Sequence, residues 1–261
     1  MIECSSGAIW SEQPKMRYLI VSDIHANIHA FDAVLNQAAG QFDKIWCLGD
    51  IVGYGPHPNE CIERLQEFDY VCVAGNHDWA ALDRLDLNDF NTDAQASTLW
   101  TQSQLTANSK EFLERLPEKH VEDGITFVHG SPREPVWEYI MFPAIAKLQF
   151  ALFDTTVCLV GHTHAPVIFS YYKSDNSPEV CEASVLPIEV TLELGQERQI
   201  INPGSVGQPR DGDPRAGYAL LDTERRELTH FRITYPVDQV QEMMRDRDLP
   251  PRLIARLSYG W

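Results

Sequence analysis

Residues 18–25 read Tyr-Leu-Ile-Val-Ser-Asp-Ile-His, a short apolar run that ends in an aspartate and a histidine. An apolar run of this length predicts a buried β-strand. Four later strand-like runs end in similar clusters: Gly49-Asp50, Gly75-Asn76-His77-Asp78, His129-Gly130 and Gly161-His162-Thr163-His164. Because the carboxyl ends of parallel strands meet at one edge of a sheet, we expect the five clusters to lie together.

The clusters carry side chains that suit metal ions. Strand residues two positions apart point to the same face, so Asp23 and His25 are expected to act as a pair of ligands, as are His162 and His164. Imidazole, carboxylate and amide ligands without thiolate suit manganese, iron or zinc, and the sequence does not rank these metals. One Asp-Gly or His-Gly alone is commonly a turn, whereas five linked clusters indicate a metal site.

The first half of the chain alternates strands and helices. Apolar spacing predicts strands at 18–22, 45–48 and 70–74, with helices at 27–39 and 59–68 between them. The segment from about residue 79 to residue 120 has a helical pattern. We interpret it as a small helical insert over the mouth of the site. Residues 172–184 are interpreted as a polar hairpin loop.

The second half is rich in short strands, predicted at 125–128, 157–160, 167–171, 185–194, 199–201, 218–221 and 228–233. Two sheets packed face to face with helices outside are expected from this order. Two helices over about 236–258, divided at Pro250-Pro251, close the chain. Their apolar residues would cover a sheet edge or form a dimer contact, so the oligomeric state stays open.

The composition limits the class of protein. With 261 residues, 44% of them hydrophobic, residues 16–261 are expected to form one domain, preceded by an extension of residues 1–15. A formal charge of −17 disfavours an extended nucleic-acid partner. No membrane span or signal peptide is recognised, and the six cysteines lack C-x-x-C spacing. We therefore expect a cytoplasmic protein with reduced thiols and no membrane partner.

The ordered motifs D-x-H, G-D, G-N-H-D, H-G and G-H-x-H resemble the signature of the calcineurin-like metallophosphoesterase superfamily, over residues 16 to about 206. The resemblance implies an α/β fold, a four-layer αββα sandwich of two mixed β-sheets flanked by helices. It also implies two divalent metal ions. One ion would be held by Asp23, His25 and His164, the other by Asn76, His129 and His162, with Asp50 bridging both.

The resemblance implies a mechanism as well. Two ions about 3.5–4 Å apart activate a bridging hydroxide for in-line attack on phosphorus. His77 matches the family histidine near the leaving-group oxygen, and Asp78 is expected to orient it. Residues 202–210 resemble a stretch beside the site of small prokaryotic members, where Gln208 or Arg210 would contact substrate; a structural loop fits equally well. Tyr54 is a further candidate for substrate binding, by stacking.

One departure bears on the substrate. Serine/threonine phosphatases of the superfamily carry G-D-x-V-D-R-G, whereas this chain has Gly53-Tyr54 in place of the Asp-Arg pair. The pattern is closer to small prokaryotic phosphodiesterases, so we expect a small phosphodiester as substrate. The alternatives are a phosphomonoesterase, including a protein phosphatase-like one, and a non-catalytic binding scaffold. A nuclease is disfavoured by the acidic composition, and the native substrate stays open.

Overall fold

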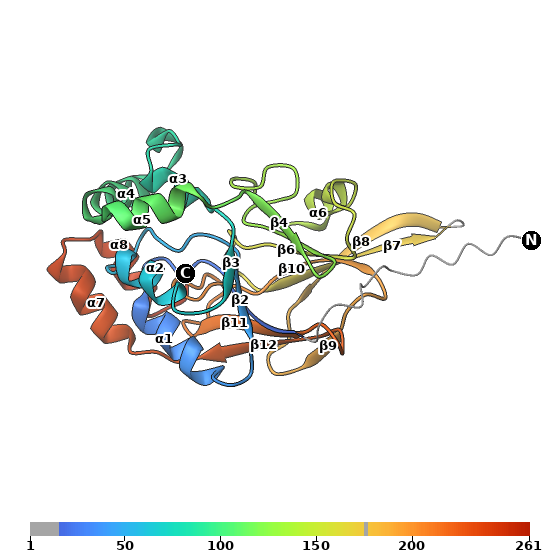
Figure 1. The fold of residues 1–261 in the computed structure, drawn as a ribbon. Coiled ribbons are helices and arrows are strands. Elements are labelled where there is room, and N and C mark those ends of the chain that lie inside the picture. Colours follow the sequence, from blue (N-terminus) through green and yellow to red (C-terminus); the bar gives the residue numbers. More distant parts are fainter. Residues whose placement is uncertain (1–15, 175–176) are drawn as a thin grey trace, which may run out of the picture.

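The computed structural model describes residues 16–174 and 177–261, so the expected extension of residues 1–15 lies outside it (Figure 1). One six-stranded sheet has the order β3-β2-β1-β11-β12-β9. Its strands are β1 (Arg17–Val21), β2 (Lys44–Cys47), β3 (Tyr70–Cys72), β9 (Thr191–Glu193), β11 (Ala216–Asp222) and β12 (Glu227–Ile233). Strands β1 to β3 are parallel and β11 is antiparallel to β1, so the sheet is mixed.

The second six-stranded sheet has the order β4-β5-β6-β10-β7-β8. Its strands are β4 (Lys119–Glu122), β5 (Ile125–Val128), β6 (Val157–Leu159), β7 (Val167–Ser174), β8 (Ser177–Val185) and β10 (Arg198–Asn202). Strands β5, β6 and β10 are parallel, and the other pairs are antiparallel. The carboxyl ends of the two parallel sets therefore each form part of a sheet edge.

The helices flank the sheets (Figure 1). They are α1 (Ile28–Gln37), α2 (Pro58–Leu65), α3 (Asn76–Ala81), α4 (Thr92–Gln104), α5 (Ala107–Glu114), α6 (Pro143–Gln149), α7 (Val237–Asp246) and α8 (Pro251–Arg256), with a 3₁₀ turn η1 (Leu87–Asp89). The outer cluster on the first sheet draws side chains from α1, α2, α4, α5, α7 and α8. Helix α6 packs in a smaller cluster on the second sheet.

Strand β1 shows why the sheets stack in this way. Leu19 and Val21 pack in the cluster under the helices, whereas Tyr18 and Ile20 pack between the sheets, as the two-residue period of a strand requires. Trp46 of β2 stacks on Tyr18 at 3.8 Å between ring centroids and on Phe127 of β5 at 5.1 Å. These contacts join the two sheets and confirm the expected layers of helix, sheet, sheet and helix.

Several local expectations were wrong. The expected loop at 172–184 is mostly the antiparallel pair β7 and β8. The single strand expected at 185–194 is divided, because β8 ends at Val185 and β9 begins at Thr191. Strand β4 lies at the end of the segment interpreted as helical, and α6 was not predicted. These elements are short or polar, so their hydrophobic periodicity is weak.

The C-terminal helices pack inside the chain. Val240 and Met244 of α7 and Leu253 and Ile254 of α8 are buried in the cluster on the first sheet. This contact accounts for their apolar faces without a second subunit. Within residues 16–174 and 177–261, no helix has the length and apolar composition needed to cross a membrane.

Candidate metal centre

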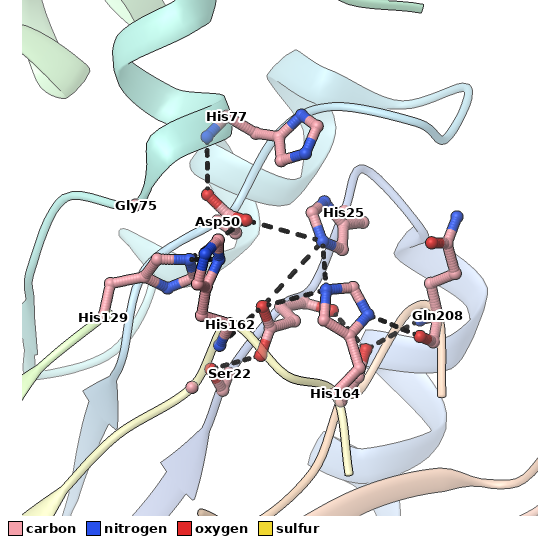
Figure 2. Close-up of polar contacts among 12 residues, drawn as sticks. Ser22, His25, Asp50, Gly75, His77, His129, His162, His164 and Gln208 are labelled. Atoms are coloured by element: carbon pink, nitrogen blue, oxygen red, sulfur yellow. Dashed lines mark hydrogen bonds and ion pairs between the residues drawn. The ribbon is translucent and has the colours of Figure 1, made fainter. Parts of the chain in front are cut away.

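The predicted ligands follow the carboxyl ends of five strands. Asp23 and His25 follow β1, Asp50 follows β2, Asn76 begins α3 after β3, His129 follows β5, and His162 and His164 follow β6. Figure 2 shows histidines from both sheets turned toward Asp50. The described part of the chain contains two groups of metal-compatible side chains, and Asp50 belongs to both. Because the two sheets pack face to face, all seven predicted ligands lie close together.

The ligands converge through turns rather than through strand alternation. Asp23, His25 and Asp50 have φ values of 53°, 48° and 54°, and His162 and His164 have 65° and 58°. Residues other than glycine rarely adopt this left-handed conformation, and when they do it is often at functional sites. Backbone hydrogen bonds hold the turns, since Asp23 N donates to Gly49 O at 3.1 Å and His25 N to Asp50 O at 3.0 Å. The expectation that Asp23 and His25, and likewise His162 and His164, point to one face of a regular strand is therefore wrong.

The first group consists of Asp23, His25, His164 and Asp50. Its histidines place their Nε2 atoms 3.1 Å apart. Asp23 Oδ1 lies 3.3 Å from His164 Nε2, and Asp50 Oδ2 lies 3.6 Å from His25 Nε2. The four side chains are buried, and their candidate ligand atoms all lie within 4.8 Å of one another. This spacing suits one ion at their centre.

The second group surrounds the other side of Asp50. His129 Nε2 lies 3.2 Å from Asp50 Oδ2, 3.1 Å from Asn76 Oδ1 and 3.1 Å from His162 Nδ1. Asp50, His129 and His162 form the second compact group, and the Asn76 amide oxygen adds a neutral ligand. The arrangement matches the ligand division that the resemblance implied.

Each of the four histidines has its outer ring nitrogen fixed by a main-chain carbonyl. His25 Nδ1 donates to Val52 O at 3.0 Å, His164 Nδ1 to Gln208 O at 2.6 Å, His129 Nδ1 to Leu48 O at 2.8 Å and His162 Nε2 to Trp137 O at 2.9 Å. A carbonyl only accepts, so these nitrogens carry the hydrogens. In the neutral rings the inward nitrogens therefore present lone pairs, as metal ligands do.

Asp50 is held so that one oxygen serves the centre. Its Oδ1 accepts a hydrogen bond from His77 N at 2.8 Å. Its Oδ2 is buried and has no hydrogen-bond partner among the described residues, although it lies between the two groups. A buried, unpaired carboxylate oxygen is costly unless a cation neutralises it. With lone pairs of histidine facing one another beside it, this donor set fits divalent metal ions.

The electrostatics of the site also favour a cation. Burial would raise the pKa of Asp50, but His129 and His77 together lower it far below its usual range. Burial lowers the pKa values of His25, His162 and His164, which keeps these rings neutral. For His129 burial is outweighed by the attraction of Asp50, which raises the pKa to about 9. Three neutral imidazoles and an ionised carboxylate are thus ready to bind metal, whereas His129 would release a proton when a metal ion binds.

Asp78 has a role different from the one expected. Its Oδ2 accepts hydrogen bonds from Asp50 N at 2.8 Å and Gly75 N at 2.9 Å. Its Oδ1 accepts from Ile51 N at 3.0 Å and Val52 N at 3.2 Å. The carboxylate therefore pins the turn that carries Asp50. The expectation that Asp78 orients the ring of His77 is wrong for this structure, because its oxygens are engaged with main-chain donors.

His77 lies beside the centre in an aromatic pocket. Its ring centroid is 5.0 Å from that of His25, 4.2 Å from that of Tyr54 and 5.3 Å from that of Phe90. Its Nδ1 is buried and lacks a partner among the described residues. Phe90, just before α4, shows that the segment predicted as an insert reaches the site. Burial lowers the pKa of His77 to about 4, so the ring is neutral near pH 7.

The three candidate substrate contacts occupy one corner. Tyr54 is buried against His25, with its ring centroids 4.6 Å apart, so it supports a predicted ligand instead of offering an open stacking face. The main-chain carbonyl of Gln208 fixes His164, and its side-chain Oε1 accepts from Arg210 Nη2 at 2.8 Å. The guanidinium of Arg210 lies over the Tyr54 ring, 5.6 Å from its centroid.

A cavity of 550 Å³ adjoins this corner. It is lined by Tyr139, Ile140, Met141, Thr163, Ala165, Val167 and Arg210. Tyr139 stacks on His162 with ring centroids 3.7 Å apart, and Thr163 separates two predicted ligands. Tyr139 could not be predicted from the sequence, because its segment joins the site only through folding.

The comparisons with known proteins agree with the fold and identify the family. Residues 16–226 match the model of the calcineurin-like phosphoesterase superfamily domain, and the chain belongs to this family. The resemblance inferred from the motifs is thereby confirmed.

Individual relatives cover nearly the whole chain. A metallophosphoesterase from Sphaerobacter thermophilus is 45% identical, with a TM-score of 0.83 over 95% of this chain and 100% of its own. An uncharacterised protein of Methanocaldococcus jannaschii is 35% identical over 94% of this chain and 99% of its own. A hypothetical protein of Pyrococcus horikoshii, 20% identical, shares the fold with a TM-score of 0.75 over 94% of this chain and 98% of its own.

Proposed function

We propose that this protein hydrolyses small phosphoesters with two divalent metal ions, and that phosphodiesters are its preferred substrates. The main support is Asp50 Oδ2, which is buried, unpaired and shared between two groups of ligand atoms. A shared carboxylate is what a centre of two ions requires. The family membership of the chain supports the same reaction class.

The residues divide into two ligand sets around Asp50. Asp23, His25 and His164 would hold one ion, and Asn76, His129 and His162 the other. Divalent manganese, iron or zinc, when bound, would lower the pKa of a water molecule and neutralise charge on the phosphoryl oxygens. The main-chain carbonyls behind the histidines fix the ring orientations, and Asp78 fixes the turn that presents Asp50.

His77 is the group we assign to the leaving-group oxygen. Its main chain is tied to Asp50 Oδ1, and its ring lies beside that of His25. A ring N–H in this place would donate to the charge that develops on the departing oxygen. The surrounding rings of Tyr54 and Phe90 hold it in position and exclude water from one side.

The preference for diesters follows from the turn after Asp50. Gly53 has a φ of 88°, and an added Cβ there would lie 2.8 Å from His77 Nδ1, so this position does not accept the aspartate of the serine/threonine phosphatase motif. Tyr54 stands where that motif has arginine. A phosphodiester carries less negative charge than a monoester and needs fewer cations. Arg210, which lies over Tyr54, favours phosphomonoester hydrolysis as the second candidate.

The test is hydrolysis of an aryl phosphodiester and the matching monoester by protein stripped of metal and then restored with Mn²⁺, Fe²⁺ or Zn²⁺. We expect turnover that returns with metal and a higher kcat/KM for the diester. Asp50→Ala should abolish it, whereas Asp246→Ala, an exposed change in α7, should not. A protein that binds two ions and hydrolyses neither ester would contradict the proposal and favour a binding scaffold.

A further inference from the structure

Two arginines share one neutral acceptor next to the candidate metal centre. Gln208 Oε1 accepts a hydrogen bond from Arg210 Nη2 at 2.8 Å and another from Arg256 Nη1 at 2.9 Å. Arg256 ends helix α8, 46 positions after Arg210 in the sequence (256 minus 210). We call Arg210 and Arg256 the guanidinium pair. The fold thus brings two positive charges to a single amide oxygen.

Within residues 16–174 and 177–261, the pair has no carboxylate partner. Among the described residues, neither guanidinium has an Asp or Glu oxygen within 4.0 Å, whereas Arg232, also held near the loop after Gln208, is paired with Asp211. The Nε atoms of Arg210 and Arg256 are both buried without a hydrogen-bond partner. Adjacent like charges with unused donors are unfavourable on their own, and an anion would relieve both costs.

The pair is coupled to the centre by short connections. Gln208 uses its main-chain oxygen to fix His164 and its side-chain oxygen to hold the pair. Arg210 N donates to His164 O at 3.3 Å, and the Arg210 side chain lines the 550 Å³ cavity beside His162. The guanidinium of Arg210 also lies over the Tyr54 ring, 5.6 Å from its centroid. Both side chains are half-buried, so they are reachable from solvent.

We infer that the guanidinium pair binds a second anionic group of the substrate, separate from the phosphoryl group that reacts. The substrate class is then a phosphoester that carries another phosphate or a carboxylate on its non-reacting part. A planar guanidinium fork suits either anion, because both offer two oxygens to parallel N–H donors. In an acidic chain this local positive charge selects anionic ligands. The inference rests on the proposed function and makes it more specific.

The test measures binding rather than turnover. Metal-loaded protein, freed of excess ions, is titrated in a calorimeter with methylphosphonate and with bisphosphonates of increasing methylene chain length. We expect at least one bisphosphonate to bind roughly tenfold or more tightly than methylphosphonate, as a charge-assisted hydrogen bond would give. Arg256→Gln should reduce this advantage to below about threefold while methylphosphonate binding stays unchanged. Arg256→Lys, which keeps the charge without the fork, should fall between.

Arg252→Gln is the matched control, because Arg252 lies on the same helix, is exposed and pairs with Asp93 at 3.8 Å. It removes the same charge and should keep the bisphosphonate advantage. Equal losses of both ligands in Arg256→Gln would assign Arg256 a structural role and overturn the inference. So would a wild-type protein without any advantage, even if it hydrolyses phosphoesters. Conversely, a selective advantage without turnover would refute only the proposed hydrolysis.

Discussion

Gly75 lies in the turn after β3, directly against Asp50. Replacing it with alanine should damage the metal centre. The glycine has a φ of −100° and a ψ of 172°, which alanine adopts without strain. An added Cβ, however, would lie 2.1 Å from Asp50 Oδ1 and 2.4 Å from Asp50 N. Contacts below 3.0 Å essentially do not occur, so Asp50 or the Gly75 backbone must shift until the two atoms lie at least 0.9 Å farther apart (3.0 minus 2.1).

This displacement sets the expected effect of Gly75→Ala. A shift of about 1 Å in a catalytic group costs on the order of 100-fold in rate, so kcat/KM should fall by about that factor. Overpacking should also cost about 1–3 kcal/mol of unfolding free energy. Metal content by elemental analysis, steady-state hydrolysis and urea unfolding measure the three quantities. The metal content should fall, because Asp50 belongs to both ligand groups.

Gly40→Ala is the control for the stability change. Gly40 has a φ of 74° and no atom within 4 Å of an added Cβ, so alanine there costs about 1 kcal/mol through its backbone conformation alone. It should leave metal content and kcat/KM unchanged. The reasoning is refuted if Gly75→Ala retains two ions per chain and hydrolyses within about threefold of the wild-type rate.

Three further predictions follow from single side chains. Asp78→Asn would place an amide NH₂ group against two main-chain N–H donors. The free energy of unfolding in urea should fall by about 2–4 kcal/mol, and metal should be lost. Unchanged stability and metal content would contradict this prediction. His77→Ala should lower kcat by about 100- to 10,000-fold with metal content unchanged. An undiminished kcat with metal bound would refute the role of His77 at the leaving-group oxygen. Burial lowers the pKa of His230 from its ordinary 6.5 to about 4, so the folded state favours the neutral ring. Its stabilisation is complete above pH 6.5 and should decline by about 3 kcal/mol as the pH falls to 4; His230→Gln should remove that decline, and an equal pH dependence in both proteins would disprove it.

The sequence predicted the parts of the fold in which apolar runs are long and buried. Strands β1, β2 and β5 are enclosed by clusters on both faces, so their hydrophobic signal is strong. The first five residues of β7 were predicted as a strand, but 172–184 were interpreted as a loop. Strands β7 and β8 extend away from the core in Figure 1, and Tyr172 and Val180 are exposed, which explains this interpretation. Hydrophobic periodicity reflects which residues are buried, so it does not reveal strands that are exposed to solvent.

The gathering of the seven candidate ligands was predictable, because each of these residues lies next to its strand in the sequence. The spacing of the motifs also showed the family resemblance, and that resemblance implied the division of the candidate ligands into two sets around Asp50. The role of Asp78 was not predictable, because its four main-chain partners depend on the left-handed turn after β2. Arg256 was missed for a different reason, since a contact across the fold leaves no pattern in one sequence.

The central claim is that Asp50 Oδ2 joins two metal ions in a phosphoesterase centre. The most direct measurement is a crystallographic anomalous map of protein loaded with Mn²⁺, collected on crystals of wild-type protein and of Asp50→Ala. We predict two peaks in the wild-type protein, one bordered by Asp23, His25 and His164 and the other by His129 and His162, each about 2.0–2.2 Å from Asp50 Oδ2. Asp50→Ala should lose at least one of them. A single peak, or two peaks that Asp50→Ala leaves unchanged, would contradict the account.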